Sequence, residues 1–213
     1  MPESPFDQRR YQVRHDWGTE GLGRLAPADV VVVVDVLRFS TTVTDAVARG
    51  EAVALDAEAH AASINGAAVA QAAGASGAVV LLGCLRNAAA VARVVLDLQH
   101  ARGARTSIAV IAAGELAGRE AGAPLRFAVE DQLGAGAIVD ALGDLGVDHT
   151  SPEAASACEV FRGLRGAVRH LLTAGGSGQE LLDRDARDEV LNASVVDAAS
   201  VVPILRDGAF VAY

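Results

Sequence analysis

The sequence predicts an α/β protein: a layered, largely parallel or mixed sheet with helices on both faces and a C-terminal β-hairpin. The first observation behind this class is that strand-like apolar runs alternate with alanine-rich stretches of helical periodicity. The second is the unbroken apolar run at 30–34, because strands covered on both faces lack the alternation of half-exposed strands. The third is Asp207-Gly208 between two strand-like runs, which favours a two-residue hairpin turn.

The predicted elements of the first two thirds of the chain follow this alternating order. Strands are expected at 30–34, 52–55, 78–82 and 107–112, and each has a helix after it or near it. All four are read as strands buried on both faces, because each is a continuous apolar run. Apolar residues at helical spacing then predict the buried faces of helices within 85–96 and 133–142.

The last third of the chain predicts helices followed by the hairpin. Ser151-Pro152 is typical of a helix start, and that helix is expected to continue past 170 and to stop at Gly175-Gly176. Ser177 and Glu180 have the spacing of a capping box, which predicts a further short helix. Pro203 at the start of the hairpin favours a sheet edge.

Length and composition indicate one large domain, residues 1–213, because a chain of this length that is 51% hydrophobic can bury a sizeable core. The net charge of −9 argues against a nucleic-acid partner, which needs clustered Lys and Arg. The N-terminus lacks the apolar core of a signal peptide, and no apolar run approaches the ~20 residues that span a bilayer. We therefore expect a cytoplasmic protein with no membrane partner. The two cysteines lack zinc-ligand spacing and are expected to be reduced thiols.

Asp35 is the most informative residue, because it directly follows the apolar run and an unpaired buried carboxylate is costly. Ligands of open α/β sheets gather beyond the carboxyl ends of strands. Arg38 offers a planar fork for an anion, and the hydroxyl run of Ser40, Thr41 and Thr42 lies where the next helix begins. A divalent cation that bridges the carboxylate and phosphate oxygens fits this mixture. The structural alternative is that Asp35 pairs with Arg38 while Ser40 or Thr41 caps the helix.

Three more polar islands follow predicted strands. The first covers residues 83–87 and includes Arg86 and Asn87, the second is Gly114 with Glu115, and the third is the pair of adjacent acids Glu130 and Asp131. Taken singly, each has a structural alternative: Asn87 would cap a helix, Arg86 would be solvated, and the two acids would favour a helix N-terminus. Four islands in equivalent positions favour a site. Cys84 at a helix start is interpreted as a small buried thiol rather than a nucleophile.

Six segments together resemble the 2-phosphosulfolactate phosphatase family, often called ComB: VVVVVDVLRFSTTV, GCLRNAAAVA, AGE, VEDQLGAGAIVDAL, SGQELL and VVPILRDGAF. They occur in the family's order and cover most of the chain. The resemblance implies an α/β fold of the family's own type and a Mg²⁺-dependent hydrolysis of 2-phosphosulfolactate to sulfolactate and phosphate, on the route to coenzyme M. It implies roles for Asp35 and Arg38 (the D-V-L-R signature), for the hydroxyl run, for Asn87, and for the E-D pair Glu130 and Asp131.

The sequence departs from the family pattern around Asn65-Gly66, which resembles the remainder of a T-N-G-T element. Ile64 and Ala67 replace the flanking threonines, and a longer glycine-rich segment that relatives carry before this pair is absent. We therefore expect that an internal loop is missing near 57–65, either because the protein has lost it or because the printed sequence omits it. A genuine deletion would remove part of the substrate pocket.

The site predicted from these residues has three parts. Mg²⁺ would be held by Asp35 with Glu130 or Asp131, and Asp35, Arg38 and Glu130 would be catalytic. Substrate contacts would come from the hydroxyl run and from the nitrogen-bearing side chains Asn65, Arg86 and Asn87. Attack by water and a phospho-enzyme at Asp35, Ser40 or Cys84 both stay open.

The partner predicted for this site is a small phosphorylated acid, and a homodimer would be unsurprising. Two alternatives remain: a phosphatase of the same fold for a different small phosphorylated acid, and a non-catalytic anion-binding or scaffold protein.

Overall fold

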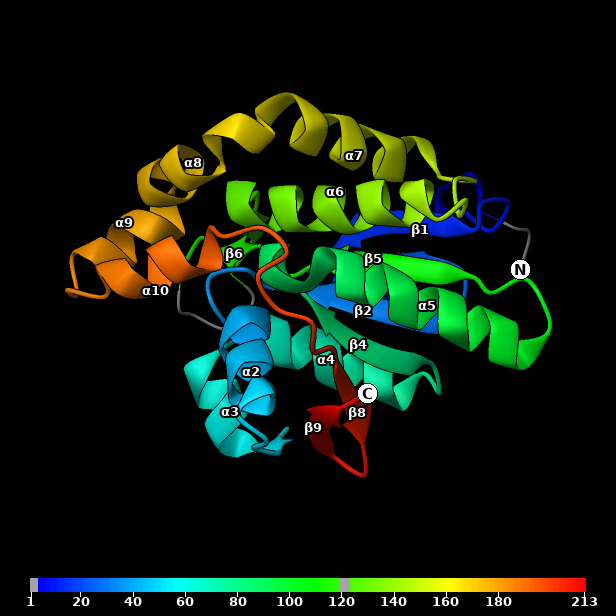
Figure 1. Ribbon diagram of the computed structural model, residues 1–213, viewed down its shortest axis with the longest axis horizontal. Helices are drawn as coiled ribbons and strands as arrows, with labels where there is room; N and C mark the ends of the chain where they lie inside the picture. The colour runs from blue at the N-terminus through cyan, green and yellow to red at the C-terminus, as the bar shows by residue number, and fades with distance from the viewer. Residues whose placement is uncertain (1–3, 119–122) are drawn as a thin grey trace.

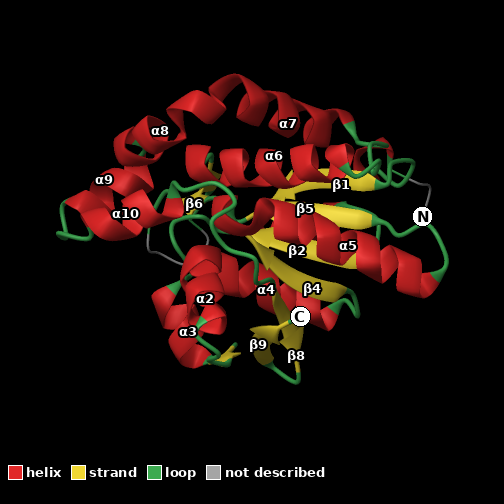
Figure 2. Ribbon diagram, in the orientation of Figure 1, coloured by secondary structure: helices red, strands yellow, loops and turns green. Residues whose placement is uncertain are grey.

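A seven-stranded mixed sheet lies between two layers of helices in the computed structural model, which describes residues 4–118 and 123–213 (Figure 1; Figure 2). The strand order is β1-β5-β2-β4-β8-β9-β3. The first four strands are parallel, and β8, β9 and β3 extend the sheet with antiparallel pairing. A separate pair, β6-β7, is antiparallel. The strands are β1 (Val13–Trp17), β2 (Val30–Val34), β3 (Val53–Ala54), β4 (Val79–Gly83), β5 (Ile108–Ala112), β6 (Glu115–Leu116), β7 (Leu125–Arg126), β8 (Pro203–Arg206) and β9 (Ala209–Ala212).

The helices alternate with the parallel strands and then gather in a C-terminal group. The first set is α1 (Gly18–Arg24), α2 (Phe39–Ala48), α3 (Ala57–Ala62), α4 (Gly66–Ala75), α5 (Ala88–Arg102) and α6 (Val129–Asp144). The C-terminal group is α7 (Pro152–Leu164), α8 (Val168–Ala174), α9 (Gly176–Leu182) and α10 (Arg187–Ala193). Three short 3-10 turns are η1 (Pro5–Asp7), η2 (Leu85–Asn87) and η3 (Arg165–Ala167).

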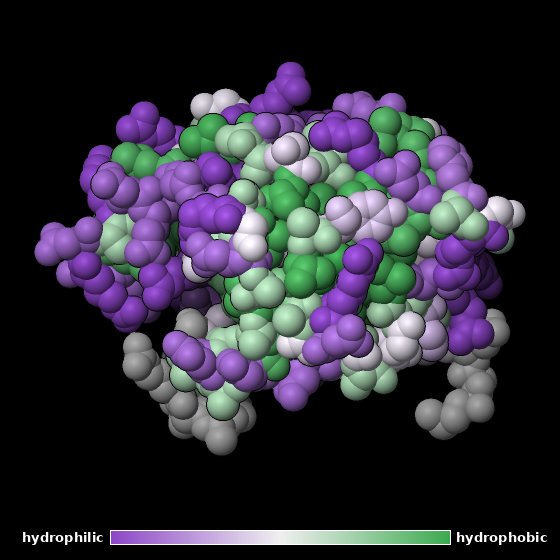
Figure 3. All heavy atoms as spheres, turned by 60° about the horizontal axis from the view of Figure 1, so that its bottom comes forward, coloured by the Kyte–Doolittle hydropathy of each residue, from purple (hydrophilic) through white to green (hydrophobic). Residues whose placement is uncertain are grey.

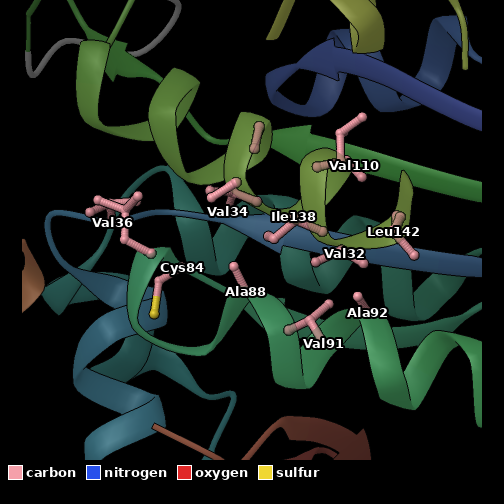
Figure 4. Close-up of a cluster of buried hydrophobic side chains, with 14 of the residues drawn as sticks. Val32, Val34, Val36, Cys84, Ala88, Val91, Ala92, Val110, Ile138 and Leu142 are labelled. Atoms are coloured by element: carbon pink, nitrogen blue, oxygen red, sulfur yellow. The ribbon is translucent and has the colours of Figure 1, made fainter. Parts of the chain in front are cut away.

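Strand β2 forms the centre of both halves of the core, because its successive side chains point to opposite faces. Val32 and Val34 join the cluster that α5 and α6 cover, where Ile138 packs against them (Figure 4). Val31 and Val33 join the other cluster, with side chains of α2 and α4. All five valines are buried, so the α/β class and the doubly covered strand are confirmed.

Three of the four predicted strands are confirmed. Strand β2 has the predicted bounds, whereas β4 and β5 each begin one residue later than expected. The prediction of a doubly buried strand at 52–55 was wrong: β3 has two residues, lies at the sheet edge and pairs with β9, and Ala54 is exposed. An apolar run of only four residues does not predict whether its strand is buried in the sheet or lies at the edge.

Strand β1 was not predicted, because its sequence VRHDW is polar. Arg14 is nevertheless buried, and its guanidinium donates to the carbonyl oxygens of Tyr11 and Ala26. The backbone of His15 exchanges hydrogen bonds with the Gln8 side chain, which satisfies polar groups on this edge strand. Because hydrogen bonds allow polar residues to be buried in this strand, its sequence lacks the apolar pattern from which strands are predicted.

The C-terminal third confirms the hairpin and corrects three details. Asp207 and Gly208 both have positive φ, of 49° and 79°, as the predicted tight turn between β8 and β9 requires. Pro203, expected at a sheet edge, begins the interior strand β8, where a first position is also tolerated. The helix expected from Ser151-Pro152 onward starts as predicted, with the Ser151 hydroxyl accepting from Ala154 N at 3.1 Å, but it is interrupted by η3. The capping box at Ser177 does not form, because Gly175 is the N-cap of α9.

In the segment 57–65, near which a missing loop was expected, residues Ala57–Ala62 form α3, which Asp56 caps by accepting from Glu58 N and Ala59 N. Figure 3 shows one face of the molecule, with hydrophobic residues gathered near its centre and hydrophilic ones towards its edges. Within the described part of the chain, no helix combines the length and the apolar character needed to cross a membrane.

Candidate active site

A cavity of about 510 Å³ lies at the carboxyl ends of β2 and β5 and is the candidate active site. Its walls come from the loops after these two strands, from the starts of α4 and α6, and from α9 with the turn after it. We call it the acidic cavity, because five carboxylate residues line it: Asp35, Glu115, Glu130, Asp131 and Glu180. The geometry is the usual one for open α/β sheets, in which strand ends and helix starts converge on a ligand.

Asp35 directly follows β2 and is only 7% exposed. Its Oδ1 accepts from Phe39 N at 3.1 Å, and its Oδ2 accepts from the Ser63 hydroxyl at 3.0 Å. Burial is the main reason that the pKa of Asp35 is raised to about 6; the charges of Glu115 and Glu130 add to this shift, and the two hydrogen bonds oppose it.

Asp131 joins the ends of the two central strands. Its Oδ1 accepts from Val36 N at 2.7 Å and its Oδ2 from Gly114 N at 2.9 Å, so one carboxylate fixes the loops after β2 and β5. Burial raises the pKa of Asp131 well above its ordinary value, and the charges of Asp35 and Glu130 raise it further. A buried acid surrounded by like charges is typical of a functional site, and it favours a compensating cation or proton.

Glu130 and Asp131 lie in the first turn of α6, as their adjacency in the sequence predicts. Glu130 is 3% exposed, and no hydrogen bond joins its carboxylate to any other described residue. A carboxylate that lines a cavity without such a bond is available to a ligand.

The α3–α4 junction forms part of the cavity wall. Asn65 lines the cavity as expected, and its Nδ2 donates to Gly114 O at 2.9 Å. A Cβ atom on Gly66 would clash with the Asp35 carboxylate, so only glycine allows the backbone of α4 to approach so closely. The remnant of the Asn-Gly element is therefore built into the cavity wall.

Arg38 lines the acidic cavity, but the guanidinium does not pair with Asp35. It donates to Glu189 on α10 at 2.7 Å, and both side chains are 47% exposed. The structural alternative of an internal Asp35–Arg38 pair is therefore not what the chain adopts. Arg38 also borders a second, more apolar cavity of about 620 Å³ next to α2 and α3.

The hydroxyl run lies outside the acidic cavity. The Ser40 hydroxyl accepts from Asp35 N and donates to Val33 O, and the Thr41 hydroxyl donates to Val36 O. Thr42 is exposed and lines the second cavity. These hydroxyls do not cap α2 either, because Arg38 holds the N-cap position without a side-chain bond. Ser40 and Thr41 therefore hold the loop that carries Asp35.

Arg86 and Asn87 are also absent from the described lining of the acidic cavity. Arg86 pairs with Asp45 at 3.2 Å and donates to Asn192 O, which ties η2 to α2 and α10. Asn87 has no exposed surface, and its side chain accepts from Cys84 N and donates to Leu82 O. Both side chains are thus engaged in contacts within the fold, and their predicted substrate contacts remain predictions.

Of the three candidate nucleophiles, only Asp35 lines the acidic cavity. Ser40 and Cys84 have no exposed surface, and burial raises the pKa of the Cys84 thiol. The interpretation of Cys84 as a buried thiol agrees with this position.

The oxygen donors of the acidic cavity suit a hard divalent cation, and the pKa values of Asp35 and Asp131 are raised because burial and neighbouring carboxylates disfavour their charged forms, which a cation or a proton would relieve. In the described ranges, however, no three acidic, histidine or cysteine side chains are arranged as a ready-made set of metal ligands. Mg²⁺ is often held by one or two carboxylates together with water and substrate phosphate, so two carboxylates are sufficient for a fit.

Comparison with protein families matches residues 53–208, more than half of the chain, to the family described as 2-phosphosulpholactate phosphatase. The chain belongs to the 2-phosphosulpholactate phosphatase family. Glu115, Glu130 and Asp131 lie inside the matched range, whereas Asp35 and Arg38 precede it. Membership supports a phosphatase-type function for this family member. A search of curated proteins gave no match.

Several residues that line the acidic cavity were not predicted as site residues from the sequence. Glu115 was noticed only as a polar residue after a strand; its Oε2 accepts from Ser177 at 3.2 Å and brings α9 to the cavity. Glu180 was interpreted only as part of a capping box, and Ser63 and Arg184 gave no signal, because residues that converge from distant segments share no spacing along the chain.

Proposed function

We propose that this protein is a Mg²⁺-dependent phosphatase that hydrolyses 2-phosphosulfolactate to sulfolactate and phosphate. The observation that carries the proposal is the convergence of Asp35, Glu130 and Asp131 with Arg38 around one cavity at the strand ends. The family match supports the reaction type and suggests the substrate. Such a reaction would lie on the route to coenzyme M and would take place in the cytoplasm.

The residues of the cavity suggest a division of work. Asp35 with Glu130 or Asp131 would hold Mg²⁺, which would neutralise charge on the phosphoryl oxygens. Arg38 would leave Glu189 and hold the phosphoryl group by a two-pronged contact. Asp131 would keep the two strand-end loops in position through its bonds to Val36 N and Gly114 N.

Attack by water is the simplest route. The water oxygen bonds to phosphorus, the ester P–O bond breaks, and the leaving oxygen takes up a proton to become the hydroxyl of the product. Glu115 and Glu130 are the candidates to accept the proton of the water, since both line the cavity. Comparing kcat of Glu115→Gln and Glu130→Gln distinguishes the two bases. Trapping of phosphate on Asp35 during turnover would instead establish the phospho-enzyme route.

A phosphate-release assay with phosphorylated two- and three-carbon acids tests the function. We expect release that requires Mg²⁺, stops with EDTA, is fastest with 2-phosphosulfolactate, and is lost in Asp35→Asn while the circular dichroism spectrum is retained. Arg187→Gln, a change on α10 outside the described cavity lining, serves as the control. Full activity of Asp35→Asn would overturn the assignment, and ligand binding without turnover would favour the non-catalytic alternative.

A further inference from the structure

Two cations line the acidic cavity within the described residues, Arg38 and Arg184. They come from distant parts of the chain: Arg38 precedes α2, whereas Arg184 lies in the turn between α9 and α10. Five carboxylate residues line the same walls. An anionic ligand that enters this cavity therefore has few positive side chains to contact, so each of them should contribute strongly to its binding.

Arg184 is held by an ion pair that a ligand can replace. Its Nη2 lies 3.4 Å from Glu180 Oε2, and the two side chains are 59% and 64% exposed. An exposed pair one helical turn apart is weak. Glu180 lines the cavity as well, so both members of this exposed ion pair border the cavity.

The backbone that carries Arg184 is fixed, although its side chain is exposed. Arg184 N donates to Leu181 O at 3.1 Å, and Ala186 N donates to the same carbonyl at 2.9 Å. Leu181 is 8% exposed and packs in the main hydrophobic cluster. The turn thus holds the arginine at the cavity rim, while the guanidinium can exchange one carboxylate for another anion.

We propose that Arg184 binds the sulfonate of the substrate and so determines specificity for a phosphate ester with this second acidic group. The inference rests on the proposed function. In 2-phosphosulfolactate the sulfonate is the acidic group furthest from the phosphate along the carbon chain, and Arg184, on the α9 side of the cavity, is the described cation left for it once Arg38 holds the phosphate. Arg86, which the sequence predicted to contact the substrate, pairs with Asp45.

The test compares 2-phosphosulfolactate with 2-phospholactate, which has the same carbon skeleton without the sulfonate. In Arg184→Gln, we expect the ratio of kcat/KM for the two esters to fall about tenfold or more, since a contact between charged groups commonly contributes at least this factor. The loss should lie mainly in KM. Arg184→Lys should restore part of the ratio, and Arg187→Gln should leave it unchanged.

An unchanged ratio in Arg184→Gln, or an equal loss for both esters, would overturn the role of Arg184. If the wild-type protein hydrolyses neither ester, the proposed function fails. Calorimetry with sulfolactate then tests separately whether Arg184 forms an anion-binding site. Sulfolactate binding by the wild type that is lost in Arg184→Gln would support the site. Equal binding by both proteins, or no binding by the wild type, would overturn it.

Discussion

Asp35 shows how one residue combines a cost to the fold with a use in the site. The carboxylate is buried next to other acids, and among the described residues two hydrogen bonds, from Phe39 N and Ser63, compensate it. Because burial disfavours the charge, the protonated form persists up to a pH of about 6 in the ligand-free protein, about two pH units higher than for an exposed aspartate. A bound cation would reverse this preference. The sequence alone singled out this position because Asp35 directly follows the apolar run at 30–34.

The raised pKa of Asp35 makes stability depend on pH. The pKa of this carboxyl group rises from 3.8 to about 6 on folding. Below pH 3.8 this shift has almost no effect on the free energy of unfolding, whereas above pH 6 it lowers the free energy of unfolding by an amount on the order of 3 kcal/mol. In EDTA, we expect the free energy of unfolding of Asp35→Asn, relative to wild type, to increase by about 2–3 kcal/mol between pH 4 and pH 7.5. Urea unfolding at several pH values measures this difference. Parallel pH profiles for the two proteins would contradict the shift.

At the scale of elements, the packing of α7 on α6 holds in place the helix that carries two of the cavity acids. Helix α6 carries Glu130 and Asp131 in its first turn and lies between the sheet and α7. Gly136 allows this approach, since a Cβ atom there would clash with Ala157 O of α7. The spacing between these helices thus depends on a residue without a side chain.

Gly136→Ala tests this contact. We expect a loss of about 1–3 kcal/mol in the free energy of unfolding, because the backbone of α7 must move. Gly143→Ala in the same helix is the matched control: a Cβ atom there has no neighbour within 4 Å, and a gain of about 0.5–1 kcal/mol is expected from helix propensity. Denaturant titration of both variants measures the contrast. Equal stabilities would show that α7 adjusts freely.

At the scale of the whole molecule, the cavity joins segments from almost the entire chain. Asp35, Asn65, Glu115, Glu130 and Arg184 come from five separate segments, and each is held by its own element. A cation bound by Asp35 with Glu130 or Asp131 would therefore link the segments that carry these acids to one another. Its effect on stability should be global, because unfolding any of them would release it.

Mg²⁺ is accordingly expected to raise the melting temperature. A concentration of one hundred times Kd should stabilise the protein by about 2.7 kcal/mol, which corresponds to roughly 5–10 °C for a chain of this size. Differential scanning calorimetry with Mg²⁺ and with EDTA measures the shift, and Asp35→Asn should abolish it. A shift that persists in Asp35→Asn would place the cation elsewhere.

The sequence by itself determined the α/β class, the central strand β2, the hairpin and the positions of Asp35, Glu130 and Asp131 at strand and helix ends. These features follow from local periodicity, turn chemistry and the order of residues along the chain, which are readable without a structure. The predicted roles of the site residues remain predictions.

Only the tertiary structure decided which polar residues meet. It placed Arg86, Asn87 and the hydroxyls of Ser40 and Thr41 in structural contacts, made the strand at 52–55 a short edge, and brought Glu115 and Arg184 to the cavity. The physical reason is that a polar side chain satisfies whichever partner the packing of distant elements brings within reach. Spacing along the chain fixes neither the partner nor the distance.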